Sequence, residues 1–150
     1  VCMHEMEMEM ADLTRRDVFI ILNLKKNLAG ADLRGIALSG LDLSQASLYR
    51  ANLYHANLER AYLVGAELLS ANLEGANLRF ANLRGVNLRK ANLKDAKLTG
   101  AKLDGVNFQG ANLQGVDLVN ARYNNQTIWP DGFDPTTKDM ENIDEPDGMV

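Results

Sequence analysis

The residues that could carry chemistry in this chain are few, and most of them stand alone. His4 lies among four methionines, and thioether sulfur beside imidazole suits Cu(I). Methionine and glutamate also alternate from Glu5 onward, which is typical of a flexible end, whether native or left over from cloning. We favour the second interpretation and expect residues 1–13 to form a flexible N-terminal arm without a metal site.

No constellation of side chains predicts catalysis. A general base needs a partner within hydrogen-bonding reach, and we expect His55 to be a surface histidine without one. No Cys/His cluster has metal-site spacing, and no glycine-rich phosphate loop precedes a helix. Four candidate nucleophiles also lack a base: Ser39, Ser44, Ser47 and Ser70. We expect no enzyme, no catalytic residues, no cofactor and no small-molecule substrate.

Residues 14–25 are predicted to form an N-terminal cap. Their start resembles a twin-arginine export signal, but the apolar run that follows is short, ends in Lys25 and Lys26, and has no small-residue cleavage site. A helix fits better, because Thr14 is a suitable N-cap and Asp17 complements the helix dipole. A strand over residues 18–22 is the alternative. The covering face of the helix would be Phe19, Ile20, Leu22 and Leu24.

A repeat supplies the elements that must position any functional side chain. Residues 26–125 read as twenty consecutive five-residue units in one frame. The central position, i, is Leu in eighteen units, and the exceptions are Phe108 and Tyr123. Position i−2 is Ala in fourteen units, i−1 is Asn or Asp in thirteen, and i+2 is Gly in ten.

A period of five fits neither a helix nor an ordinary strand. Positions i−2 and i lie two residues apart, so a short extended piece points both apolar side chains to the same side. Glycine at i+2 tolerates the positive φ of a tight turn, and Asn or Asp at i−1 can bond to the backbone near that corner. The pattern predicts a coil with Leu and Ala inside, which is stable only when coils stack.

Ala-Asn-Leu recurs at residues 51–53, 81–83, 91–93 and 111–113. These units resemble the A-(N/D)-L-x-x signature of pentapeptide-repeat proteins of the cyanobacterial type. The resemblance implies an all-β fold, namely a right-handed quadrilateral parallel β-helix with four units per coil and about five coils over residues 26–125. It also implies four interior columns: Leu28-Leu48-Leu68-Leu88-Phe108, Leu33-Leu53-Leu73-Leu93-Leu113, Leu38-Leu58-Leu78-Leu98-Leu118 and Leu43-Leu63-Leu83-Leu103-Tyr123.

The composition changes after Asn120. Pro130 and Pro135 interrupt regular structure. Residues 126–150 are therefore predicted to form a C-terminal cap followed by a disordered tail, which we place at 136–150 because that stretch is acidic and poor in apolar residues. The cap is expected to cover the open end of the stack with Ile128, Trp129 and Phe133.

Charge and composition narrow the function classes. The chain has 150 residues and a net charge of −4, which divides into −2 over residues 1–25, +4 over 26–125 and −6 over 126–150. The single cysteine, Cys2, excludes an intramolecular disulfide and fits a reducing compartment, so we expect a cytoplasmic protein. No apolar stretch approaches the ~20 residues of a membrane-spanning helix, so we expect no membrane partner.

Two surface features could bind a partner. Large apolar groups outside a rod are typical of a protein-binding patch, although scattered surface aromatics are also common. The patch would be Tyr49, Tyr54, Tyr62 and Leu69. A basic band is typical of contact with nucleic acid or acidic protein, but this one wraps around several sides, and only Phe80 accompanies it as an aromatic platform. The band is Arg79, Arg84, Arg89, Lys90, Lys94, Lys97 and Lys102.

We therefore expect a non-enzymatic scaffold that binds an unknown protein partner through its coil surface. The alternative, which rests on the resemblance, is an effector of a topoisomerase such as DNA gyrase, acting as a DNA mimic or directed at nucleic acid. Family members of that kind rely on an acidic surface that imitates duplex phosphates, whereas this coil carries +4. We expect no nucleic acid partner.

Overall fold

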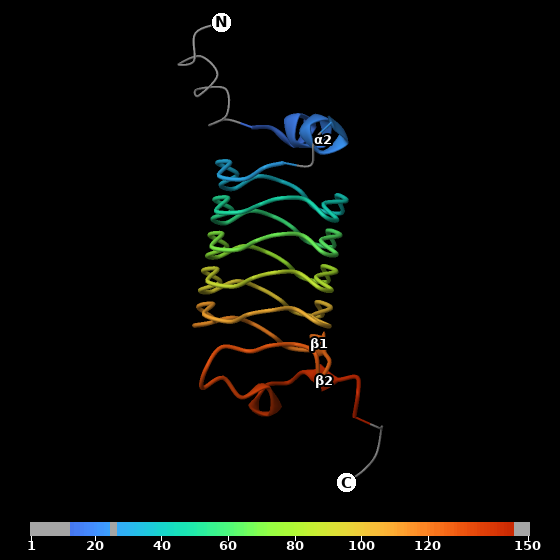
Figure 1. The fold of residues 1–150 in the computed structure, drawn as a ribbon, viewed down its shortest axis with the longest axis vertical. Coiled ribbons are helices and arrows are strands. Elements are labelled where there is room, and N and C mark those ends of the chain that lie inside the picture. The colour runs from blue at the N-terminus through green and yellow to red at the C-terminus, as the bar shows by residue number, and fades with distance from the viewer. Residues whose placement is uncertain (1–12, 25–26, 146–150) are drawn as a thin grey trace, which may run out of the picture.

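The computed structural model describes residues 13–24 and 27–145. The protein is a rod of stacked coils, with helix α2 (Arg15–Leu24) across one end and a short C-terminal segment across the other (Figure 1). That segment contains η1 (Pro135–Thr137) and β2 (Glu141–Asn142), and β2 pairs in parallel with β1 (Arg122–Tyr123). The expected arm, with His4 and its methionines, falls almost entirely outside the described residues.

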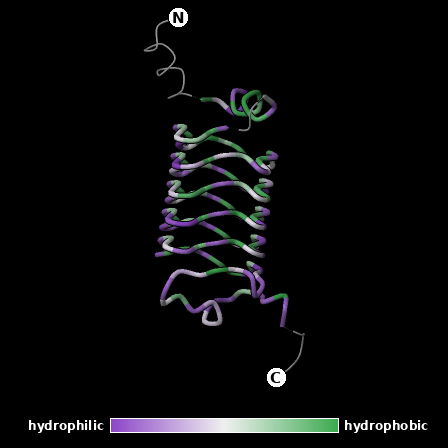
Figure 2. Tube along the Cα trace, in the orientation of Figure 1, coloured by the Kyte–Doolittle hydropathy of each residue, from purple (hydrophilic) through white to green (hydrophobic). Residues whose placement is uncertain are grey.

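The coils repeat every twenty residues. Parallel bridges join Asn52 to Asn72 and Tyr62 to Asn82, and the same offset holds at four positions in each turn of the rod. Each side of the coil is extended for so few residues before the next turn that it forms isolated bridges in place of longer strands. Hydrophobic and hydrophilic stretches alternate around every coil (Figure 2).

The backbone of one unit shows why five residues suffice. The N–H groups of Leu53 and His55 donate to the coil below (2.7 and 2.9 Å), and that of Asn52 donates to the coil above (2.9 Å). The Ala56 N–H closes the turn onto the Leu53 carbonyl (2.9 Å). The remaining donor, the Tyr54 N–H, bonds to the Asn52 side chain (3.2 Å), which confirms the role expected for Asn and Asp at i−1.

The turn places every described i+2 residue, from Gly30 to Asn120, in the left-handed region, with φ between 54° and 73°. Glycine adopts this conformation at least cost, which explains its frequency there. Gly75 shows a second reason, because a Cβ on it would lie 2.6 Å from the His55 ring, which leans over it from the coil above.

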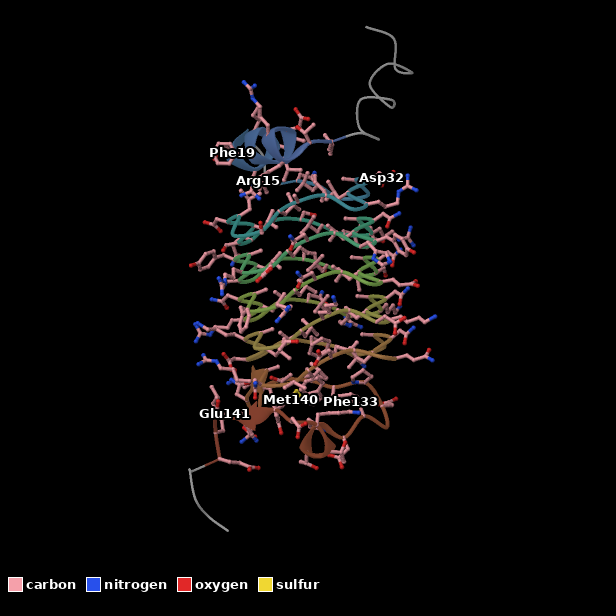
Figure 3. All side chains as sticks on the ribbon, turned by 180° about the vertical axis from the view of Figure 1, so that it is seen from behind. Arg15, Phe19, Asp32, Phe133, Met140 and Glu141 are labelled. Carbon is pink, nitrogen blue, oxygen red and sulfur yellow. The ribbon has the colours of Figure 1, made fainter. Side chains whose placement is uncertain are left out.

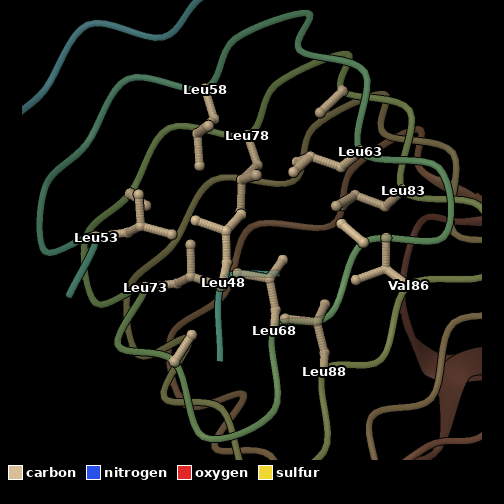
Figure 4. Close-up of a cluster of buried hydrophobic side chains, with 14 of the residues drawn as sticks. Leu48, Leu53, Leu58, Leu63, Leu68, Leu73, Leu78, Leu83, Val86 and Leu88 are labelled. Atoms are coloured by element: carbon tan, nitrogen blue, oxygen red, sulfur yellow. The ribbon is translucent and has the colours of Figure 1, made fainter. Parts of the chain in front are cut away.

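The core is the set of inward columns that the sequence predicts. Leu53, Leu73 and Leu93 are fully buried, and the leucines converge on the axis of the rod (Figure 4). Leu113 and Val116 are only partly buried, because the chain covers that part of the last coil less completely.

Helix α2 lies within the predicted cap region, but it buries a different face from the one predicted. The Asp17 N–H donates to the Thr14 hydroxyl (3.3 Å) and the Thr14 N–H to the Asp17 carboxylate (2.9 Å), which is a reciprocal capping arrangement. Val18 and Leu22 are the buried residues, whereas the predicted Phe19 and Ile20 are 53% and 46% exposed. Residues 15, 18 and 22 share one helical face, which lies against the first coil. From this face the Arg15 guanidinium donates a hydrogen bond to the Ala37 carbonyl (3.2 Å).

An aromatic cluster closes the other end of the rod. The Trp129 ring stacks between Phe108 (5.0 Å between centroids) and Phe133 (4.9 Å) and meets the edge of Tyr123 (5.5 Å). Trp129 therefore extends the Phe108 column by one more layer. The prediction was wrong for Ile128, which is 49% exposed, because its backbone bridges to Asn107 and its side chain points outward.

The prediction of a disordered tail from residue 136 was also wrong for residues 136–145. The Asn120 N–H donates to the Asp139 carbonyl (2.7 Å), and the Glu141 N–H donates to the Ala121 carbonyl (2.9 Å). Met140 packs against the core at this end of the rod (Figure 3). Composition misses this order because the segment is held largely through backbone groups of the last coil, which have no further coil to pair with.

Leu78 tests the column assignment. Leu78→Ala is expected to lower the free energy of unfolding by about 2–5 kcal/mol, because it leaves a cavity in a fully buried stack. Leu78→Arg is expected to prevent folding, because it buries an unpaired charge. Chemical denaturation measures the first effect, and Leu113→Ala, at a partly buried position, is the milder control. A normal thermal transition in Leu78→Arg would refute the assignment.

Asp17 makes the α2 cap sensitive to acid. Its pKa lies below the ordinary value of 3.8, chiefly because the carboxylate accepts a hydrogen bond from the Thr14 side chain. Because the folded-state pKa is depressed, this stabilisation is present above the ordinary value and is lost as the pH falls through the folded-state pKa. We expect Asp17→Asn to melt earlier than the native chain at about pH 7, and the difference to shrink as the pH falls below the ordinary value of 3.8 and through the folded-state pKa. An equal difference throughout a series of thermal scans would contradict this.

Candidate interaction surface

The stacking register assigns every surface residue to one of four sides. Each side is defined by its bridged i−1 positions in the second and third coils: Ser47 and Glu67 for the first side, Asn52 and Asn72 for the second, Asn57 and Asn77 for the third, and Tyr62 and Asn82 for the fourth. Position i+1 projects from the same side, and i+2 forms the corner before the next side. A side chain at i+1 can therefore change without entering the core.

The structure divides the predicted aromatic patch. Tyr49 and Leu69 lie in one column of the first side, as the Arg50 N–H bond to the Leu69 carbonyl shows (3.0 Å). Tyr54 lies on the second side and Tyr62 on the fourth. The three tyrosine side chains are 39%, 41% and 54% exposed, in chain order, whereas Leu69 is half-buried. Tyr49 with Leu69 is thus the only predicted pair that shares a column.

Neighbouring side chains support two of these tyrosines. The Arg50 guanidinium carbon lies 5.4 Å from the centre of the Tyr49 ring. The ring of His55 meets the Tyr54 ring edge-on at 4.3 Å. His55 therefore packs between the Tyr54 ring and Gly75. These contacts explain the histidine as a packing residue of the corner.

The predicted basic band is not evenly spread. Arg79 and Lys97 lie on the third side, and Arg84 and Lys102 lie on the adjacent fourth side, where Arg122 continues the Lys102 column. The three remaining members belong to the first two sides: Arg89, Lys90 and Lys94. The cations are therefore most concentrated around the corner between the third and fourth sides.

That corner carries Phe80, whose side chain is 45% exposed. The guanidinium carbon of Arg60 lies 5.3 Å from the ring centre, and that of Arg79 lies 5.9 Å away. The same ring covers Gly100 in the next coil. The sequence interpretation omitted Arg60, although the twenty-residue register alone places it directly above Phe80.

An ionic cluster lies lower on the fourth side. The carboxylate of Asp104 pairs with Arg84 (2.9 Å) and Arg122 (3.1 Å), and its side chain is only 10% exposed. Its second oxygen, Oδ1, and the Nε of Arg122 are buried without a protein hydrogen-bond partner. The members of this cluster were not among the predicted surface residues as a group, although the twenty-residue register brings them together. The cluster ties three successive coils to one another.

The described part of the chain offers neither a metal site nor a membrane-spanning helix. No three residues among His, Cys, Asp and Glu are grouped there so that they could hold a metal ion. In the same residues, no helix has the length and apolar character needed to cross a membrane.

Comparison with known proteins gives the family. A model of pentapeptide repeats matches residues 27–63, 51–89 and 91–122 in eight copies. The chain belongs to the pentapeptide-repeat family. Members of this family are right-handed β-helical solenoids and are in general structural or interaction proteins. Among proteins with curated functions, none is a significant match to this chain.

Solved structures of other pentapeptide-repeat proteins resemble this one. A protein of the Arabidopsis thaliana thylakoid lumen is 31% identical, with a TM-score of 0.52 over 62% of this chain and 68% of its own. HetL of Nostoc sp. PCC 7120, which is involved in regulating heterocyst differentiation, is 26% identical, with a TM-score of 0.47 over 77% and 73%. QnrB1, a plasmid-mediated fluoroquinolone resistance protein, is 21% identical, with a TM-score of 0.33 over 77% and 62%.

Asp104 offers a test of the ionic cluster. Asp104→Ala is expected to lower the free energy of unfolding by about 2–4 kcal/mol, because it leaves the half-buried Arg122 without its carboxylate. The control is Arg34→Gln, since Arg34 pairs with Asp32 but its side chain is 61% exposed, and such surface pairs contribute less than about 1 kcal/mol. Urea denaturation of both variants gives the comparison, and equal losses would contradict the prediction.

Proposed function

We propose that this pentapeptide-repeat protein is a non-enzymatic scaffold that binds protein partners through the outer surface of its coils. The observation that carries the proposal is the Tyr49–Leu69 column, with Arg50 against the tyrosine ring. Tyrosine and arginine dominate the binding energy of protein interfaces, and Leu69 adds apolar area beside them. The fold itself does not need large side chains at these outward-facing positions, because the core and the backbone hydrogen bonds are complete without them.

The rigidity of the rod favours this role. Coil-to-coil hydrogen bonds hold the backbone on both sides of Tyr49 and Tyr54. Binding of a partner therefore does not lose the conformational entropy that the ordering of a flexible loop would cost. We further infer that residues 26–125 form five four-sided coils with α2 as a lid, and that the protein works in the cytoplasm. The 31% identical relative comes from the thylakoid lumen, so fractionation of the source cell is the direct test of the compartment.

The alternative is a DNA-mimicking or nucleic-acid-directed effector of a topoisomerase, and the charge of the coil argues against the mimic. A mimic of duplex phosphates needs an acidic surface, whereas Arg79, Arg89 and Lys90 are exposed. The likeness to QnrB1 concerns the fold alone. A gyrase supercoiling assay separates the two functions, because a scaffold without this target leaves supercoiling unchanged.

Site-specific crosslinking tests the Tyr49–Leu69 column. A photoreactive phenylalanine analogue at position 49 is expected to capture a discrete partner in extract of the source cell, and the additional change Leu69→Ala to reduce that capture. The matched control carries the analogue at Val119, which is also exposed (43%) but lies on the third side near the end of the rod. Identical products from both positions, or products insensitive to Leu69→Ala, would remove the column from the proposal.

A further inference from the structure

The corner between the third and fourth sides differs from the other corners. We call it the Phe80 corner and define it by Arg60, Tyr62, Arg79, Phe80 and Arg84. At the other corners, a large i+2 side chain is followed one coil below by Gly or Ser, as His55 is by Gly75 and Arg50 by Ser70.

Only here, among the i+2 positions from 30 to 120, do two large side chains follow each other. Arg60 and Phe80 resolve the crowding by stacking, with the guanidinium carbon 5.3 Å from the ring centre. Arg79 approaches the same ring at 5.9 Å. The stack fixes two guanidinium groups beside an exposed aromatic ring, although each arginine alone would be mobile on the surface.

These guanidinium groups keep their hydrogen-bonding capacity. No protein acceptor for the side chains of Arg60 or Arg79 occurs in the described part of the chain, and Glu59, in the column above Arg79, forms no ion pair with it there. A guanidinium stacked on a ring still presents its N–H groups at its edge, where a carboxylate can accept two of them. Lys97 and Lys102 add positive charge on the two adjoining sides.

The geometry favours carboxylates over nucleic acid bases. A base would have to stack on Phe80, but that ring already contacts Arg60 and covers Gly100. The composition of the corner also favours a protein partner. It has two exposed aromatic residues and three arginines, with lysines only at the margin, and the centres of protein interfaces are rich in aromatic residues and arginine. We propose that the Phe80 corner binds an acidic segment of a protein partner, whose carboxylates pair with Arg60 and Arg79. This inference rests on the proposed scaffold function and adds a second surface with a stated partner chemistry.

The test uses a fluorescein-labelled oligo-glutamate peptide as the probe, with oligo-glutamine and single-stranded oligothymidylate of equal length for comparison. The native chain is expected to bind oligo-glutamate in preference to both. Arg60→Gln/Arg79→Gln should weaken this binding about tenfold or more, the equivalent of about 1.4 kcal/mol. The control, Arg89→Gln/Lys90→Gln, removes the same charge from the first side and should weaken it less than about threefold.

Three results would overturn the inference: no binding of oligo-glutamate, equal losses in the two double variants, or tighter Arg60-dependent binding of oligothymidylate. If the Gln double variant fails to fold, Arg60→Lys/Arg79→Lys provides the test. It keeps the charge but loses the planar guanidinium that can donate two hydrogen bonds to one carboxylate. It should therefore still bind oligo-glutamate more weakly than the control variant does. Crosslinking at Tyr49 that persists while oligo-glutamate fails to bind would sink this inference and leave the scaffold function standing.

Discussion

The structure depends on one constraint, which is that most backbone N–H groups of each unit, such as those of Asn52, Leu53 and His55, donate to the coils before and after it. The constraint fixes the register, and the register places every leucine in a column on the axis. A shift by one residue would break the ladder and turn leucines outward together. The repeat therefore tolerates almost any residue at i+1 while it tolerates little at i, and function is confined to the exterior for that reason.

Most of the fold was predictable because it is local and repeated. Leu at i, Ala at i−2 and Asn or Asp at i−1 each have a physical role within a single unit, and the burial of Leu53, Leu73 and Leu93 confirms the inward columns. The ends were harder because nothing repeats there. The face of α2 follows from how Arg15 meets the first coil, and the order of residues 136–145 follows from the free backbone edge of the last coil, which composition does not reveal.

The candidate surfaces show a similar division. The twenty-residue register is enough to separate Tyr49, Tyr54 and Tyr62 onto different sides. It also places Arg60 above Phe80 and Arg122 beside Asp104. It could not show that Arg60 and Arg79 both turn toward the ring, since those side-chain torsions depend on the left-handed corner and on the crowding below it. Spacing therefore predicts neighbours, whereas contacts require the turn geometry.

A substitution at a corner position affects the neighbouring coil, whereas a substitution at i+1 does not. In the left-handed conformation, an i+2 side chain leans over the next coil, so Phe80 occupies the space that a side chain at position 100 would need. A large residue at one corner thus either has glycine or a small residue one turn below it or, as Arg60 does on Phe80, stacks on the side chain there. Gly100 is as much a part of the Phe80 corner as Arg60 is. Side chains on such a rod can change independently along its sides, whereas corner residues twenty apart constrain each other. This coupling explains why many glycines recur below large corner residues and not at every turn.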